Sequence, residues 1–236
     1  MEVHTHTHTQ RKKWTHYFWE FLMLFFAVFC GFLAEYQLEH KIEKDREKQF
    51  MQSLVRDIKR DIEQGDNLSL QNKLSQQLCD SLLIMLVSKE ININSYPAFR
   101  LWGNISGFYD LIPNDGTTQQ LKNSGALRLV RKQEVVDRLM DYNRELELIK
   151  IHQAVMNTYL FQPSKKSELF DAPRFANEND RVNVPLLNSD RKLLSWGYEY
   201  INGWKNLLGA LNIYVEVAKT KGKALLESVS KEYHLK

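Results

Sequence analysis

Three histidines near the N-terminus alternate with threonine in the run HTHTHT, at His4, His6 and His8. Imidazole nitrogens at this density bind transition-metal ions in any flexible peptide. A dedicated metal site also needs ligands held in a fixed geometry, and no cage of cysteine or carboxylate side chains accompanies these histidines. We therefore expect only weak metal capture here and predict no metal site and no cofactor.

Two carboxylates stand one helical turn apart, at Asp57 and Asp61. Such a pair could work as a general acid and a general base. However, Arg56, Lys59 and Arg60 surround it, and opposite charges at helical spacing are typical of a solvated face with ion pairs. The sequence therefore predicts a structural role for both aspartates.

Cys79 lies between Leu78 and Leu82, which is typical of a small residue in a hydrophobic core. A reactive or intermolecular thiol is the alternative. The other cysteine, Cys30, falls inside a hydrophobic segment, so no disulfide between the two is expected.

Ser124 precedes Gly125, but a serine nucleophile would need a GxSxG turn after a strand, and neither is present. The histidines at 40, 152 and 234 stand singly and are expected on helix surfaces. The dinucleotide, P-loop, HExxH and CxxC motifs are missing as well. A hydrolase with dispersed catalytic residues is therefore the least favoured class of function.

Residues 17–36 read YFWEFLMLFFAVFCGFLAEY, long enough as a helix to cross the hydrocarbon core of a bilayer. Glu20 and Glu35 are the charged residues of this stretch, and only Glu20 interrupts the apolar run, because Glu35 stands at its end. Trp14, Trp19 and Tyr36 lie toward its two ends, where such rings prefer the headgroup region. A cleaved signal peptide is the rival interpretation, but its small-x-small cleavage site is missing. We predict an uncleaved anchor over residues 14–36, after a short basic tail at 1–13.

Basic residues flank both ends of this anchor. Those at 11–13 are compact and adjoin the membrane, whereas those at 41–48 alternate with acidic residues. The positive-inside rule then favours a cytoplasmic N-terminus and an extracytoplasmic domain.

One face of the anchor carries Glu20, Leu24, Ala27, Gly31 and Ala34. Small residues four positions apart let two helix backbones approach closely in a membrane. The face is a candidate helix–helix interface for a second copy or another membrane protein. Alternatively, Glu20 lies close enough to the headgroups to extend into water.

Residues 37–236 are predicted to form an all-α domain, an elongated antiparallel helical bundle. A four-residue rhythm of apolar side chains continues beyond the anchor, with a break expected at Gly65. Short helical turns are expected over 98–116, and a left-handed helix end at Gly125. One helix should run from Gln133 to before Pro163 and another should begin after Ser189 or Asp190, with a Pro-rich surface loop over 163–189 between them. The apolar rows that carry these predictions are Leu38, Ile42, Phe50, Leu54, Ile58 and Ile62; Leu70, Leu74, Leu78, Leu82 and Leu86; and Tyr200, Trp204, Leu208, Leu211, Val215, Leu225 and Val229.

The overall charge is nearly balanced, at +3, and 43% of residues are apolar. Nucleic-acid binding is not expected, because it calls for a strongly basic face. The apolar fraction is enough for a real core.

The segments RKKWTHYFWEFLMLFFAVFCGFLAEYQLEH, REKQFMQSLVRDI, TTQQLKNSGALRLVRKQEV and ESVSKEYHLK together resemble a family of uncharacterised single-pass membrane proteins from Bacteroidota. The resemblance extends over essentially the full chain and is weakest in the Pro-rich loop. It implies a bacterial inner-membrane location, and it implies no reaction, ligand or catalytic residues.

Two further functions remain beside the hydrolase. The preferred one is a membrane-anchored helical scaffold or interaction module, whose partners are the lipid bilayer and a second copy or another membrane protein. The other is an extracytoplasmic ligand-binding or sensory domain, with a pocket lined by Phe99, Trp102, Phe108 and Tyr109. Ordinary core packing of these four rings is the simpler interpretation.

Overall fold

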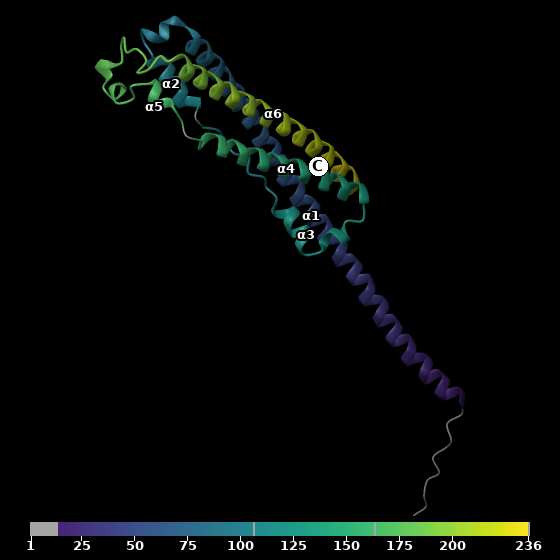
Figure 1. Cartoon of the computed structure of the whole chain (residues 1–236). Coiled ribbons are helices and arrows are strands. Elements are labelled where there is room, and N and C mark those ends of the chain that lie inside the picture. The colour runs from purple at the N-terminus through teal and green to yellow at the C-terminus, as the bar shows by residue number, and fades with distance from the viewer. Residues whose placement is uncertain (1–13, 106, 163, 236) are drawn as a thin grey trace, which may run out of the picture. The chain divides into compact units, whose positions relative to one another are not determined.

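The computed structural model describes residues 14–105, 107–162 and 164–235, and no strand occurs within these ranges. The all-α prediction is confirmed. The histidines at 4, 6 and 8 lie outside the described residues. The α-helices are α1 (Trp14–Val87), α2 (Tyr96–Ile105), α3 (Gly116–Asn123), α4 (Gln133–Leu160), α5 (Lys166–Leu169) and α6 (Arg191–Tyr233) (Figure 1). The 3-10 helices are η1 (Lys89–Asn92), η2 (Ala126–Leu129), η3 (Arg174–Ala176) and η4 (Glu178–Asp180).

The chain divides into two compact units, Met1–Gln49 and Phe50–Lys236. In the first unit, the described residues all belong to α1, and most of their side chains are exposed. The second unit holds the hydrophobic core. It begins later than residue 37 because Leu38 and Ile42, expected on the buried row, are 59% and 42% exposed.

From Phe50 onward, α1 buries a seam of residues. Their positions alternate three and four apart, except for one step of seven after Asn72: Leu54, Ile58, Asp61, Gly65, Leu68, Asn72, Cys79, Leu82 and Leu86. The four-residue row expected from the sequence is wrong in its middle, since Leu70 and Leu74 are exposed. A strict four-residue step rotates about 40° around a helix at each repeat. Alternating steps of three and four average 3.5 residues and stay on one face.

No break occurs at Gly65, where α1 continues as a regular helix. A Cβ atom at this position would lie 3.1 Å from Cδ of Lys219 and 3.2 Å from Cγ1 of Val215, both on α6. The glycine therefore serves close helix packing, and the expectation of a kink is corrected.

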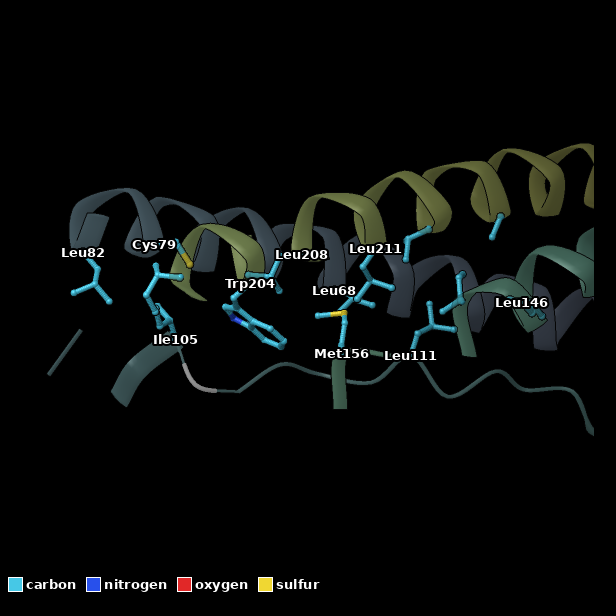
Figure 2. Packing of buried hydrophobic residues seen from close by; sticks show 14 of the residues in the cluster. Leu68, Cys79, Leu82, Ile105, Leu111, Leu146, Met156, Trp204, Leu208 and Leu211 are labelled. Carbon is cyan, nitrogen blue, oxygen red and sulfur yellow. The ribbon is translucent and has the colours of Figure 1, made fainter. Parts of the chain in front are cut away.

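Helix α6 runs antiparallel to α4 and to the second-unit part of α1. Three side-chain pairs between α1 and α6 show this direction, because the α6 residue number falls as the α1 number rises. They are Asp66–Lys219, Asn72–Asn212 and Asp80–Lys205. The antiparallel bundle is thereby confirmed. Figure 1 shows α4 and α6 side by side, and Figure 2 shows Leu208 and Leu211 of α6 pointing into the interior that Leu68 and Met156 also fill.

The pairing with α4 follows the same antiparallel order, from Glu145–Lys221 to Tyr159–Tyr200. Because α6 opposes both helices, α1 and α4 run in the same direction. A return connection between them is therefore required.

Residues 107–115 supply that return connection without regular secondary structure. Short turns under a loop were expected over 98–116; among the described residues of this stretch, those of α2 up to Ile105 and the first residue of α3, Gly116, are helical. Leu111 is buried in the core, as Figure 2 shows. On either side of it, Asp110 accepts a hydrogen bond from Gln153, and Asn114 bonds to Asp61. The segment is thus held against both α1 and α4.

The predicted C-terminal end of α3, the bounds of α4 and the start of α6 agree with the structure, whereas α3 begins at Gly116, before the threonines at 117 and 118 that could have capped it. Gly125 adopts a left-handed conformation with φ of 67° after α3. Asp190 caps α6 by accepting hydrogen bonds from the amides of Lys192 and Leu193. Helix α4 begins at Gln133 and ends at Leu160, before the proline.

The Pro-rich segment 163–189 is more than a surface loop. It includes α5, η3 and η4, and it buries Leu169, Phe170, Phe175, Val184 and Leu186. Ser95 holds it by donating to the carbonyls of Val184 and Pro185. The sequence did not predict that this segment contributes to the core, because its apolar residues are irregularly spaced and follow no helical period.

Candidate functional site

The hydrophobic segment of α1 is a candidate membrane-spanning segment by its length and composition. Its most apolar 18-residue window has a mean hydropathy of 1.9, and none of it is buried. Among the described helices, α1 is the one that is long and apolar enough to cross a membrane. A core helix of a soluble domain would instead bury its apolar face, because exposed apolar surface of this extent is unfavourable in water.

The aromatic rings of this segment gather on one side of the helix. Phe21, Phe25 and Phe29 stack in a ladder, with ring centres 6.3 and 5.9 Å apart. Rings exposed on a helix in this way suit a hydrocarbon environment, where they need no polar partner. The ladder leaves the opposite side to smaller side chains.

That opposite side carries all four residues of the candidate helix–helix interface: Glu20, Ala27, Gly31 and Ala34. All four are exposed, and a Cβ atom at Gly31 would meet nothing within 4 Å. Glu20 lies 3.3 Å from Nε2 of His16, one turn earlier. The helix therefore presents these residues together on an open surface, while the interface itself stays a prediction.

Asp61 is buried in the second unit, with only 4% of its surface exposed, so the solvated ion-pair face predicted for it is wrong. Oδ1 of Asp61 accepts hydrogen bonds from the backbone N of Asn114 at 2.7 Å and from its side-chain Nδ2 at 2.8 Å. Oδ2 accepts from the hydroxyl of Tyr142 at 2.9 Å. One turn earlier, Asp57 accepts a hydrogen bond from Thr117. The two aspartates thus join α1 to the return connection, α3 and α4.

The hydrogen bonds of Asp61 hold elements of the bundle together, and they do not form a catalytic arrangement. Burial, followed by the charge of the nearby Asp61 carboxylate, raises the pKa of the Tyr142 phenol far above its usual value. Three donors already occupy the Asp61 carboxylate, and a phenol with so high a pKa is a poor acid. Sequence reasoning missed the cluster because its members are distant in the chain.

A second polar group links α1 to α6 at Lys219, which is almost fully buried. Its Nζ lies 2.6 Å from Asp66 and 2.8 Å from Glu216, and Ser69 also donates to Glu216. Burial lowers the pKa of Lys219, but the hydrogen bonds to both carboxylates outweigh it and leave the pKa raised. Each charge in the group therefore has an opposite partner.

Three of the four aromatic residues considered for a sensory pocket pack in or against the core. Trp102 is buried and stacks on Trp196 and Tyr200, with ring centres 6.1 and 5.9 Å away. Phe108 packs edge-on against Trp204. The ring of Tyr109, in contrast, is 68% exposed.

Phe99 completes the cluster by packing against Phe170 and Phe175, and the ammonium of Lys166 lies 4.5 Å above its ring. These rings fill the space that a pocket would need. The simpler interpretation, core packing, therefore describes three of the four predicted residues.

The remaining candidates have ordinary structural surroundings. Cys79 is buried and free, as is expected of a core residue, and burial raises the pKa of its thiol to about 11. His152 lies 2.9 Å from the carbonyl of Leu207 on α6. Ser124 donates to the carbonyl of Gln120 at the end of α3. Within the described ranges, no cluster of three or more potential metal ligands occurs.

Comparisons of the chain with protein-family models, with curated proteins and with solved structures find no match.

Proposed function

We propose that this chain is a membrane-anchored helical scaffold or interaction module. The hydrophobic segment of α1 would hold the helical domain at a bacterial inner membrane. The observation that carries the proposal is the exposed window of mean hydropathy 1.9. The aromatic ladder and the flanking tryptophan and tyrosine rings support it further.

The helical domain is packed in one defined arrangement, as a scaffold requires. Its long helices α4 and α6 pack along each other, and buried polar contacts at Asp61 and Asn72 fix how they meet α1. Specific hydrogen bonds within an apolar seam favour one register over its neighbours. The buried titratable groups Asp61, Tyr142 and Lys219 are engaged in contacts of this kind, which favours binding over catalysis.

The compact basic group at 11–13 supports a cytoplasmic N-terminus and a domain on the outer side of the membrane. Membership in the uncharacterised Bacteroidota membrane family is part of the same proposal. Under this topology, residues 1–13 would lie in the cytoplasm.

Extraction of membranes with alkaline carbonate tests the anchor. We expect the full-length chain to stay in the membrane pellet. A variant with Phe25, Phe26 and Val28 replaced by lysine should appear in the supernatant, since each lysine near the centre of a bilayer costs about 2.5–3.5 kcal/mol. Release of the unsubstituted, unprocessed chain by carbonate would overturn the proposal.

Labelling in intact spheroplasts tests the orientation. In a C30S background, a cysteine at Lys73, which is exposed on α1, should react with an impermeant maleimide from outside. A cysteine at position 12 should react only after the membrane is broken. The reverse pattern would overturn the proposed orientation and leave the anchor standing.

A further inference from the structure

Residues 164–189 cover an aromatic face of α2, and we name this segment the strap. Figure 1 shows the strap in green at the end of the bundle where α2 lies. Phe170 and Phe175 of the strap pack on Phe99 of α2, with ring centres 5.7 and 4.8 Å away. The ring of Phe175 also lies 5.2 Å from that of Tyr96. A segment with little regular secondary structure therefore shields these rings from solvent.

The strap is closed on itself by its own main-chain hydrogen bonds. The amide of Leu187 donates to the carbonyl of Leu169 at 2.9 Å, so the two ends of the strap lie together. Between these ends, main-chain bonds within the strap join residues close in sequence, such as Phe175 to Ala172 at 3.2 Å. A compact loop with this organisation can separate from its neighbours as one unit.

Ser95, directly before α2, attaches the strap to the bundle. Its amide donates to the carbonyl of Val184 at 2.7 Å. Its hydroxyl lies 3.0 Å from the same carbonyl and 3.1 Å from that of Pro185. Because Ser95 is fully buried, water cannot replace these bonds while the strap is docked, and losing one is costly. Ser95 thus has the position of a latch.

One contact of the strap opposes docking. The ammonium of Lys166 lies 4.5 Å above the ring of Phe99, and within the described ranges it has no carboxylate partner. Burial lowers the pKa of this lysine, which means that the docked strap disfavours its charged form. Opening of the strap returns the ammonium to water.

The bundle keeps its own contacts without the strap. The Asn72–Asn212 pair joins α1 to α6, and Trp102 of α2 stacks on Trp196 of α6. The five apolar side chains that the strap buries must offset the conformational entropy lost by the whole irregular segment. Helices α4 and α6 are held along their length by helical hydrogen bonds as well. The local stability of the strap should therefore be lower than theirs.

We propose that the strap is a lid, latched by Ser95, which opens as a unit over the aromatic face of α2 while the bundle stays folded. Opening uncovers the rings of Tyr96 and Phe99, so the latch controls access to this face. The inference does not depend on the proposed membrane anchor.

Amide hydrogen exchange of the full-length chain in detergent micelles tests the lid. The amide of residue 95 is freed when the strap opens, whereas that of Ile149 lies in the core of α4. We expect protection of amide 95 to be at least about 100-fold lower than that of Ile149. S95A keeps this amide and removes the hydroxyl, and it should lower the protection of amide 95 by about tenfold more while Ile149 stays unchanged. S167A removes an exposed hydroxyl of the strap and should change neither.

Thiol labelling supplies an independent test. In the C30S background, V184C places a thiol at a buried position of the strap, and the natural Cys79 reports on the bundle core. We expect V184C to react with a maleimide at least about tenfold faster than Cys79. Adding S95A should raise the rate at V184C by about tenfold and leave that at Cys79 unchanged.

Equal protection of amide 95 and Ile149 would overturn the proposal, because the strap would then open only when the bundle unfolds. An effect of S95A no larger than that of S167A, or an equal rise in labelling at V184C and Cys79, would also overturn it. Should S95A fail to fold, the ratio of V184C to Cys79 labelling without that substitution decides the proposal by itself.

Discussion

The hydroxyl of Tyr142 on α4 donates a hydrogen bond to Oδ2 of Asp61 on α1, 2.9 Å away and 81 residues earlier in the chain. Both groups are buried. This bond joins the two helices that run in the same direction, and it lies where the return connection ends against α1. The stability of the bundle should therefore depend on it.

Replacing Tyr142 by phenylalanine removes one of the three donors to the Asp61 carboxylate. The buried charge then lacks part of its solvation, and we expect the free energy of unfolding to fall by about 1–3 kcal/mol. Urea unfolding followed by helical circular dichroism measures the change. The control Y109F alters an exposed ring and should change little. Equal effects of the two variants would contradict the structural role of Asp61.

Gly65 and Gly103 are both helical glycines, but their surroundings differ. A Cβ atom at Gly65 would contact Lys219 and Val215 closely, whereas one at Gly103 would meet nothing within 4 Å. We expect G65L to lower the free energy of unfolding by about 1–3 kcal/mol through overpacking. G103L should raise it by about 0.5–1 kcal/mol through helix propensity. Stabilisation by G65L would show that α1 and α6 are not so closely packed there.

The thiol of Cys79 should make stability fall at high pH. Its pKa is raised by burial from 9.0 to about 11 in the folded chain, so folding favours the protonated thiol. The resulting stability is fully present below pH 9 and is lost as pH rises to 11, by about 1–3 kcal/mol. Unfolding of the natural chain and of C79A at several pH values measures the difference. Parallel pH profiles would contradict the burial of this thiol.

The carboxylates of Asp66 and Glu216 beside Lys219 should make stability fall at low pH, in contrast to the thiol of Cys79. Hydrogen bonds from Lys219 lower the pKa of Asp66 and of Glu216 in the folded chain. Stability from these groups is present above their unfolded pKa values and is lost as pH falls through the folded ones. Between pH 5 and pH 3, the natural chain should lose more stability than K219M.

The size of this acid effect should be small, because Asp66 and Glu216 are more than half exposed. The control K73M removes an exposed lysine and should keep the acid dependence of the natural chain. An identical pH profile for K219M would show that the two carboxylates gain nothing from Lys219.

Sequence reasoning located the helices whose apolar rows are long and whose ends carry standard signals. Asp190, Gly125 and the apolar row of α6 gave α3 and α6 their correct positions, because caps and helical periods are local properties. The predicted break at Gly65 was wrong because the role of this glycine depends on tertiary packing. A glycine can break a helix or admit a neighbouring one, and only the position of α6 decides between the two.

The buried polar groups could not be predicted from the sequence either, because their partners also depend on tertiary packing. Asp61 has basic neighbours in sequence, yet its partners in space are Asn114 and Tyr142. The small-residue face of the anchor, in contrast, could be predicted, because residues on one helix face follow from spacing alone. What such a face contacts depends on a second molecule and does not follow from one chain.

The most direct test of the account is a measurement of depth in the bilayer along residues 17–36. Single nitroxide labels placed from position 18 to position 40 of the full-length chain in vesicles would be tested for collisions with oxygen and with a water-soluble nickel chelate. The account predicts that the ratio of oxygen to nickel accessibility is highest near Phe26 and falls toward both ends of the segment. A nickel accessibility at position 26 equal to that at position 40 would contradict the membrane anchor.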